Sequence, residues 1–205
     1  DMSVIQKAMD EIGICFLMAP RHHMAMRHVA ASRSELGTRT IFNILGPLAN
    51  PALVKKQLVG VFSEAWVEPM AQVLKGLGSE RAWVVHGSDG LDEITTTGVT
   101  KVAALDKGSV STFTIHPEDA NLELANPKQL KGGLPGQNAM ALENLLRGEK
   151  GPYRDIVLFN SAAAFIIAEK VDNLKEGAEL AAEMIDTGQA KQKLDQLISI
   201  TAHTG

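Results

Sequence analysis

Apolar positions along the chain follow two spacings that indicate different secondary structures. In some segments they recur every three or four residues, the spacing of one helix face. In others they form short continuous runs of strand length. The helical spacing predicts helices over Ser3–Ile12, His22–Val29, Ser34–Leu45 (ended by Gly46–Pro47) and Glu64–Leu77. The runs predict strands over Ile14–Ala19, Gln57–Phe62 and Arg81–His86. Two more strands are predicted over Thr100–Leu105 and Val110–Ile115, joined by a hairpin-like turn at Asp106–Gly108.

The pattern changes after His116, where Pro117–Gly136 is rich in Pro, Gly, Asn and Asp and predicts a long connection. Beyond it the spacing predicts helices only, over Ala139–Leu146, Tyr153–Glu169, Leu174–Ile185 and Ala190–Ile198. Strands that alternate with helices in the first half indicate an α/β layer architecture. The run Ala162–Ala168 is too apolar to face water, so the helical half should pack on the sheet.

Composition narrows the class of protein. The 205 residues carry 20 Lys and Arg against 24 Asp and Glu, a net charge of -4, which argues against nucleic-acid binding by bulk charge. The single cysteine, Cys15, excludes a disulfide framework and a Cys-pair zinc site. No apolar run approaches the roughly 20 residues of a membrane span, and no secretory signal is visible. We therefore expect a cytoplasmic protein that binds neither nucleic acid nor membrane.

One acidic turn is a candidate metal site. The predicted strand that ends at His86 leads through Gly87 into a stretch with Asp89, Asp92 and Glu93 within five positions. Ligands of open α/β sheets bind at the carboxyl ends of strands, and Mg²⁺ is usually held by one or two carboxylates together with waters and substrate phosphates. An acidic, solvated turn explains the same spacing, because such turns are common.

Three other stretches carry charge that could bind an anion. Pro20–His28 holds five cationic or imidazole side chains, which fit either an anion site or a solvated basic helix face. Arg33 could form a fork for a carboxylate or phosphate, or an ion pair with an acid such as Glu35. The stretch Arg147–Asp155 lacks the spacing of a phosphate-binding loop, so we interpret it as a connection with Pro152 near the start of the next helix.

Several longer motifs together resemble one known family. The run GTRTIFNILGPLANPA and three later segments occur in order and at the expected spacing over nearly the whole chain. On these motifs the chain resembles the anthranilate phosphoribosyltransferase family of tryptophan biosynthesis. The four matching segments are Gly37–Ala52, Gln57–Val61, Val84–Glu93 and Arg154–Ala164.

The resemblance implies a fold, a reaction and a set of site residues. The fold would be α/β, with a central mixed, largely parallel sheet flanked by helices and a helical C-terminal segment. The reaction would transfer a 5-phosphoribosyl group from phosphoribosyl pyrophosphate to the amine of anthranilate, and pyrophosphate would leave. Asp92 and Glu93 would bind Mg²⁺, whereas Arg33 and His23 would bind anthranilate. His23 begins a His-Met-Ala-Met motif in which Met24 replaces the family's usual proline.

No side chain is assigned as a catalytic acid or base by this resemblance. Anthranilate's aromatic amine is already neutral near pH 7, so orientation and electrostatic stabilisation are expected to carry the reaction. A divalent ion on the leaving pyrophosphate would stabilise the negative charge that develops there.

The family's glycine-rich Gly-Thr-Gly-Gly-Asp loop does not occur in this sequence. The loop lies in the family N-terminal to the point that matches Asp1. We therefore expect residues 1–205 to be the large α/β domain without the N-terminal helical domain, inactive alone and homodimeric in the complete enzyme. One alternative is a pyrimidine-nucleoside phosphorylase, which the acidic loop Gly90–Glu93 disfavours. The other is a non-enzymatic nucleic-acid-binding relative, which the negative net charge disfavours.

Overall fold

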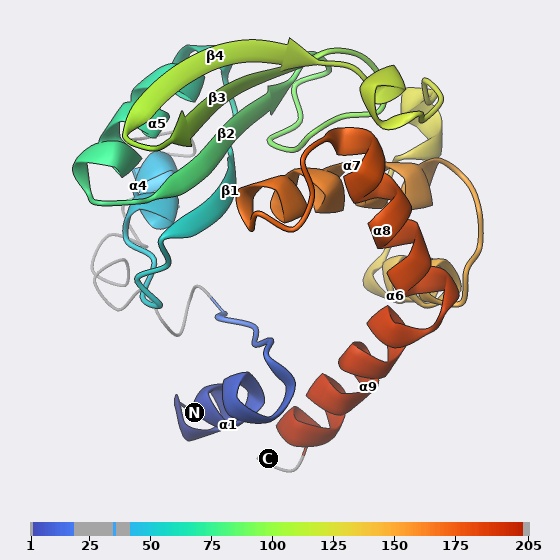
Figure 1. The fold of residues 1–205 in the computed structure, drawn as a ribbon. Coiled ribbons are helices and arrows are strands. Elements are labelled where there is room, and N and C mark those ends of the chain that lie inside the picture. The colour runs from blue at the N-terminus through green and yellow to red at the C-terminus, as the bar shows by residue number, and fades with distance from the viewer. Residues whose placement is uncertain (1, 19–34, 36–41, 203–205) are drawn as a thin grey trace. The chain divides into compact units, whose positions relative to one another are not determined.

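The computed structural model describes residues 2–18, 35 and 42–202. The chain divides into two compact units. Figure 1 labels their helices and strands. One unit comprises Asp1–Leu53 and Gly188–Gly205, and the other comprises Val54–Thr187. Within the described residues every helix is too short or too polar to cross a lipid bilayer.

The unit Val54–Thr187 is built on a four-stranded mixed sheet. Its strands are β1 (Lys56–Gly60), β2 (Arg81–Gly87), β3 (Thr100–Asp106) and β4 (Ser109–Ile115), in that spatial order. The predicted mixed α/β sheet and these four strands are confirmed. Only β1 and β2 pair in parallel, while β2–β3 and β3–β4 are antiparallel. Parallel pairs therefore do not predominate among the described strands. A tight turn at Lys107 and Gly108 returns β4 directly along β3.

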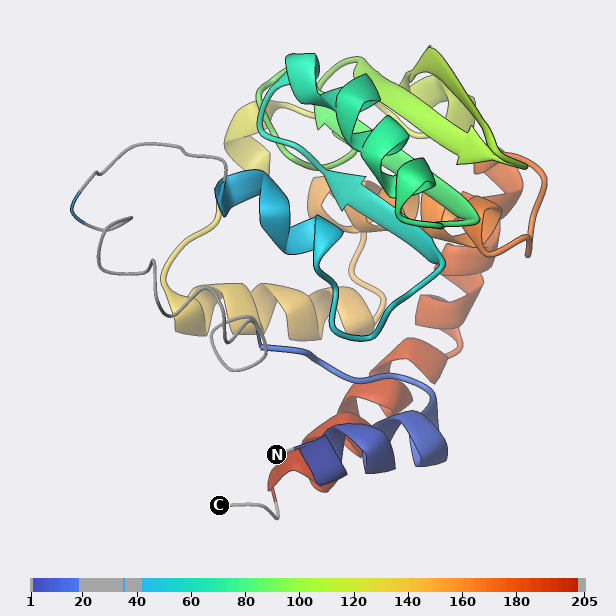
Figure 2. The same ribbon diagram turned by 90° about the vertical axis from the view of Figure 1, so that its left-hand side faces the viewer.

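Helices cover both faces of this sheet (Figure 2). On one face lies α5 (Val67–Gly76), preceded by the short 3₁₀ turn η2 (Glu64–Trp66), and on the other lies α7 (Pro152–Ile167). The remaining elements of the unit are α8 (Leu174–Asp186), α6 (Pro135–Leu146), and the 3₁₀ turns η3 (Pro117–Ala120) and η4 (Pro127–Gln129) in the predicted connection. The helical half was expected to pack on the sheet; α7 does so, whereas α8 packs on α7.

Small residues bring α7 and α8 close together. A Cβ atom on Gly177 of α8 would stand 2.7 Å from the Cα atom of Ala162 on α7. Phe159, Ala162 and Ala163 of α7 are fully buried. The α8 helix begins where it was predicted to, because the side chain of Asn173 accepts a hydrogen bond from the Glu176 N–H at 2.9 Å.

A buried arginine ties the start of α7 to the end of α8. Arg154 Nη2 donates a hydrogen bond to Asp186 Oδ2 at 2.8 Å, and Nη1 lies 2.8 Å from Oδ1. This hydrogen bond is the main cause that lowers the pKa of Asp186 below its ordinary value. Pro152 is the first residue of α7, as predicted. The interpretation of Arg147–Asp155 as a connection holds, since its buried arginine already has a carboxylate partner.

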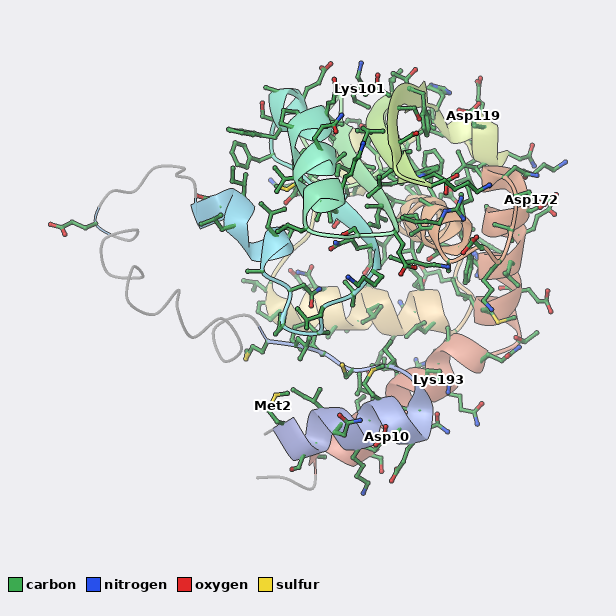
Figure 3. All side chains as sticks on the ribbon, turned by 60° about the vertical axis from the view of Figure 1, so that its left-hand side comes forward. Met2, Asp10, Lys101, Asp119, Asp172 and Lys193 are labelled. Atoms are coloured by element: carbon green, nitrogen blue, oxygen red, sulfur yellow. The ribbon has the colours of Figure 1, made fainter. Side chains whose placement is uncertain are left out.

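The other unit contains α1 (Met2–Ile12), α4 (Phe42–Leu48) and α9 (Gln189–Ala202). The helices α1 and α9 pack together, and Ala8 and Ile12 are buried. Lys193 of α9 lies beside α1 and donates a hydrogen bond from Nζ to the Ile12 carbonyl oxygen at 2.8 Å (Figure 3). A cation at this position satisfies a carbonyl that the end of a helix leaves free.

Two predictions for this unit are wrong. Residues 14–18 of the predicted strand Ile14–Ala19 form no regular structure, and Ile14, Phe16 and Met18 are exposed. A strand needs a hydrogen-bonded neighbour, and none of the described strands pairs with this run. Gly46–Pro47 does not end the helix, because α4 continues through Pro47 to Leu48. The predicted helix His22–Val29 and most of Ser34–Leu45 lie outside the described residues.

The end of β1 fits against the loop that follows β2. A Cβ atom on Gly60 would stand 1.6 Å from the carbonyl oxygen of Asp92 and 2.5 Å from its carbonyl carbon. No side chain fits in that space, and the obstacle is backbone, which cannot rotate away. Gly60 therefore permits the loop to lie directly on the sheet.

We predict that Gly60→Ala lowers the free energy of unfolding of the chain by about 1–3 kcal/mol, the usual cost of overpacking. Gly76→Ala is the matched control, because a Cβ atom at this α5 position meets nothing within 4 Å. That variant should be neutral or more stable by up to about 1 kcal/mol. Urea denaturation of both variants measures the difference, and equal stability of the two would contradict the steric account.

Candidate metal-binding loop

The acidic stretch predicted from the sequence is a tight loop between β2 and β3. It leaves the carboxyl end of β2, beside the carboxyl end of the parallel strand β1. The Gly87 N–H donates to the Leu91 carbonyl oxygen and the Gly90 N–H donates to the Gly87 carbonyl oxygen, both at 2.9 Å. Gly90 has a φ of 92°, which a residue with a side chain rarely adopts. These turns place Asp92 and Glu93 at the sheet edge where α/β proteins bind ligands.

Asp89 holds the loop together from inside. Its Oδ2 accepts hydrogen bonds from the hydroxyl groups of Thr95 and Thr97, both at 2.6 Å. Its Oδ1 accepts from the Leu91 N–H at 3.1 Å. Partial burial alone would raise the pKa of Asp89, but these hydrogen bonds outweigh it and the pKa lies below its ordinary value. Asp89 is therefore an ionised structural residue whose oxygens already have donors.

The threonines that follow connect the loop to its surroundings. Thr95, Thr96 and Thr100 are fully buried. The Thr95 N–H donates to the Thr100 hydroxyl at 3.0 Å, and the Ala125 N–H donates to the Thr96 carbonyl oxygen at 2.8 Å. Buried polar groups with partners rigidify the backbone that carries them.

The α7 helix, which lies much later in the sequence, makes a second contact with the loop. Asn160 Nδ2 donates to the Ile94 carbonyl oxygen at 2.8 Å, and the Ile94 N–H donates to Asn160 Oδ1 at 3.1 Å. The sequence reasoning missed this residue. The available signals were an amide in a largely apolar helical run and its place in the matching segment Arg154–Ala164, and neither pointed to a partner 66 residues away.

Unlike Asp89, Asp92 and Glu93 have carboxylates that could bind a ligand. Within the described part of the chain, neither makes a hydrogen bond or an ion pair with a basic side chain. Partial burial, followed by the negative charge of Asp92, raises the pKa of Glu93 above its ordinary value. A bound cation would oppose both effects on Glu93, because a nearby positive charge favours the ionised carboxylate.

The two carboxylates of Asp92 and Glu93 suit Mg²⁺ better than Zn²⁺. No group of three or more His, Cys, Asp or Glu side chains gathers at metal-ligand distances among residues 2–18, 35 and 42–202. A closed structural zinc site needs four such ligands. Mg²⁺ needs only one or two carboxylates, because waters and substrate phosphates complete its octahedron. Asp92 and Glu93 thus fit Mg²⁺ held jointly with a phosphorylated ligand.

The other predicted site residues cannot be placed. His23 and Arg33 both lie outside the described residues, so their positions relative to the loop stay predictions.

Comparisons with known proteins agree with the fold. The family model described as "Glycosyl transferase family, a/b domain" matches residues 1–191. The anthranilate phosphoribosyltransferase of Phenylobacterium zucineum is 58% identical over 196 residues, which are 96% of this chain and 58% of that protein. The enzyme of the same name from Paramagnetospirillum magneticum is 55% identical over 204 residues, which are 100% of this chain and 59% of that protein.

Solved structures of anthranilate phosphoribosyltransferases have a similar fold. The anthranilate phosphoribosyltransferase of Thermus thermophilus is 42% identical, with a TM-score of 0.89 over 96% of this chain and 58% of that one. The Saccharomyces cerevisiae enzyme in complex with PRPP and Mg is 31% identical, with a TM-score of 0.90 over 99% of this chain and 58% of that one. The chain thus spans less than two thirds of the length of these relatives. The match over residues 1–191 and the shared fold place this chain in the glycosyl transferase family with this α/β domain.

Proposed function

We propose that this chain supplies the metal-binding part of an anthranilate phosphoribosyltransferase. The reaction would transfer the 5-phosphoribosyl group of phosphoribosyl pyrophosphate to the amine of anthranilate. The observation that carries the proposal is the loop after β2, in which Asp92 and Glu93 are the acids left without partners among the described residues. The names of the relatives support the substrates, and the comparisons give no support to a nucleoside phosphorylase or a nucleic-acid-binding protein.

Asp92 and Glu93 would hold Mg²⁺ against the pyrophosphate group. Such an ion stabilises the negative charge that develops on the leaving oxygens. Asp89 and Asn160 would keep the backbone of this segment fixed, so that the carboxylates need not reorganise during the reaction. Asp92 and Glu93 therefore contribute binding and orientation, and no proton transfer is assigned to them.

Anthranilate would be bound by residues that precede α4 in the sequence. Arg33 would pair with its carboxylate through a charge-assisted fork, and His23 would line its entry. The homodimer and the cytoplasmic location implied by the family resemblance belong to the same proposal.

Removal of the two carboxylates should abolish the use of Mg²⁺. The test uses a chimera in which this chain replaces the matching 196 residues of the Phenylobacterium zucineum relative. We predict that Asp92→Asn with Glu93→Gln lowers the Mg²⁺-stimulated rate by about 100-fold or more, because the ion supplies several kcal/mol and 1.36 kcal/mol is tenfold. The matched control is Asp10→Asn with Glu11→Gln, an adjacent acidic pair exposed on α1. An unchanged Mg²⁺ titration in the loop variant rejects the assignment.

Replacement of Arg33 should weaken anthranilate selectively. In the same chimera, Arg33→Ala should raise the KM for anthranilate about tenfold or more, since loss of one partner of a desolvated charge pair costs about 2–5 kcal/mol. The KM for phosphoribosyl pyrophosphate should change little, and Arg33→Lys should restore binding only in part. If Arg33 instead pairs with an acid such as Glu35, Tm falls while the anthranilate KM stays the same.

A further inference from the structure

We infer that Asn160 is the positioning residue of the metal loop, and that its amide sets the affinity of Asp92 and Glu93 for Mg²⁺. The inference rests on the proposed function. It assigns to α7, which carries none of the predicted ligands, a role in positioning the loop that carries them.

Both ends of the Asn160 amide hold the same loop residue. Oδ1 accepts from the Ile94 N–H at 3.1 Å, and Nδ2 donates to the Ile94 carbonyl oxygen at 2.8 Å. Two bonds to one peptide segment fix its orientation as well as its distance, as a strand partner would. Ile94 follows Glu93 directly, so the peptide that carries one proposed ligand is held on its carboxyl side.

The amide is itself held in place by its own helix. Asn160 Nδ2 also donates to the carbonyl oxygen of Ile156, one turn earlier in α7, at 2.9 Å. Both Nδ2 protons therefore have acceptors, so the side chain has little freedom to rotate. The neighbouring residue Phe159 is fully buried, so α7 is a rigid base for this contact.

A separate contact holds the other side of the same segment. The carbonyl group of Asp92 packs on Gly60 at the end of β1. Glu93 therefore lies between two fixed points, the Asp92 carbonyl group on the sheet and Ile94 on α7, and Asp92 carries the first of them. Without the second point the two like charges are free to swing apart, and a cation would have to bring them together again on binding. A metal site whose supporting contacts are removed typically loses 10- to 100-fold in affinity.

The kinetic test uses Asn160→Ala and the isosteric Asn160→Asp in the chimera described above. Asn160→Asp keeps the acceptor for the Ile94 N–H but replaces the donor with an oxygen that repels the Ile94 carbonyl. Both variants should raise the Mg²⁺ concentration for half-maximal rate by about tenfold or more. The KM for anthranilate should stay within about twofold of its original value, because Asn160 acts only through the loop. Ile167→Ala, a buried position two turns further along α7, is the control for lost stability alone.

A second readout needs no activity. In the full chain, Asn160→Ala should speed hydrogen exchange of the Ile94 amide, while amides within the β2–β3 ladder keep their protection. Unchanged Mg²⁺ half-saturation in both variants, with or without a fall in Tm, overturns the inference, as does unchanged exchange at Ile94. If the Asp92 and Glu93 double variant also leaves the Mg²⁺ dependence intact, the proposed function fails; if that variant abolishes it, only the role of Asn160 fails.

Discussion

The carbonyl group of Asp92 occupies the space that a side chain at position 60 would fill. This contact lets the loop after β2 rest on the carboxyl end of β1, and it depends on the parallel pairing that brings the two strand ends side by side. A residue larger than glycine would lift the loop from the sheet. The geometry of the candidate site therefore depends first on glycine at position 60 of β1. Hydrogen bonds made by Asp89 and Asn160 then fix the rest of the loop.

Those polar contacts separate the acids of the loop into two kinds. Asp89 accepts three hydrogen bonds from within the loop, which keep it ionised and hold the chain folded around it. Asp92 and Glu93 have no such donors among the described residues, and their mutual repulsion is left for a cation to relieve. A rigid frame around an unsatisfied charge pair is a preorganised electrostatic site, because little reorganisation is needed when the ligand arrives.

The sequence predicted the strands of the sheet and the acidic loop, but not the side-chain contacts that hold the loop in place. Short apolar runs located β1 and β2, because burial on a sheet leaves that pattern, and the hairpin-like turn at Asp106–Gly108 helped to locate β3 and β4. The same pattern failed at residues 14–18, since a run of apolar residues does not reveal whether a strand partner exists. The spacing of the acidic residues fitted both a metal site and a solvated turn. Only the family resemblance indicated Asp92 and Glu93 as the metal ligands. Asn160 was missed because a side-chain contact across 66 residues leaves no local periodicity.

The most direct test of the central claim is to locate a bound metal ion on this chain. Mn²⁺ prefers the same carboxylate and water ligands as Mg²⁺ and broadens nearby NMR signals. In the presence of pyrophosphate, substoichiometric Mn²⁺ should broaden the amide signals of residues 91–94 first. Broadening that is centred on another acidic group, such as Glu118–Asp119, or that spreads evenly over the surface carboxylates, would contradict a metal site in this loop.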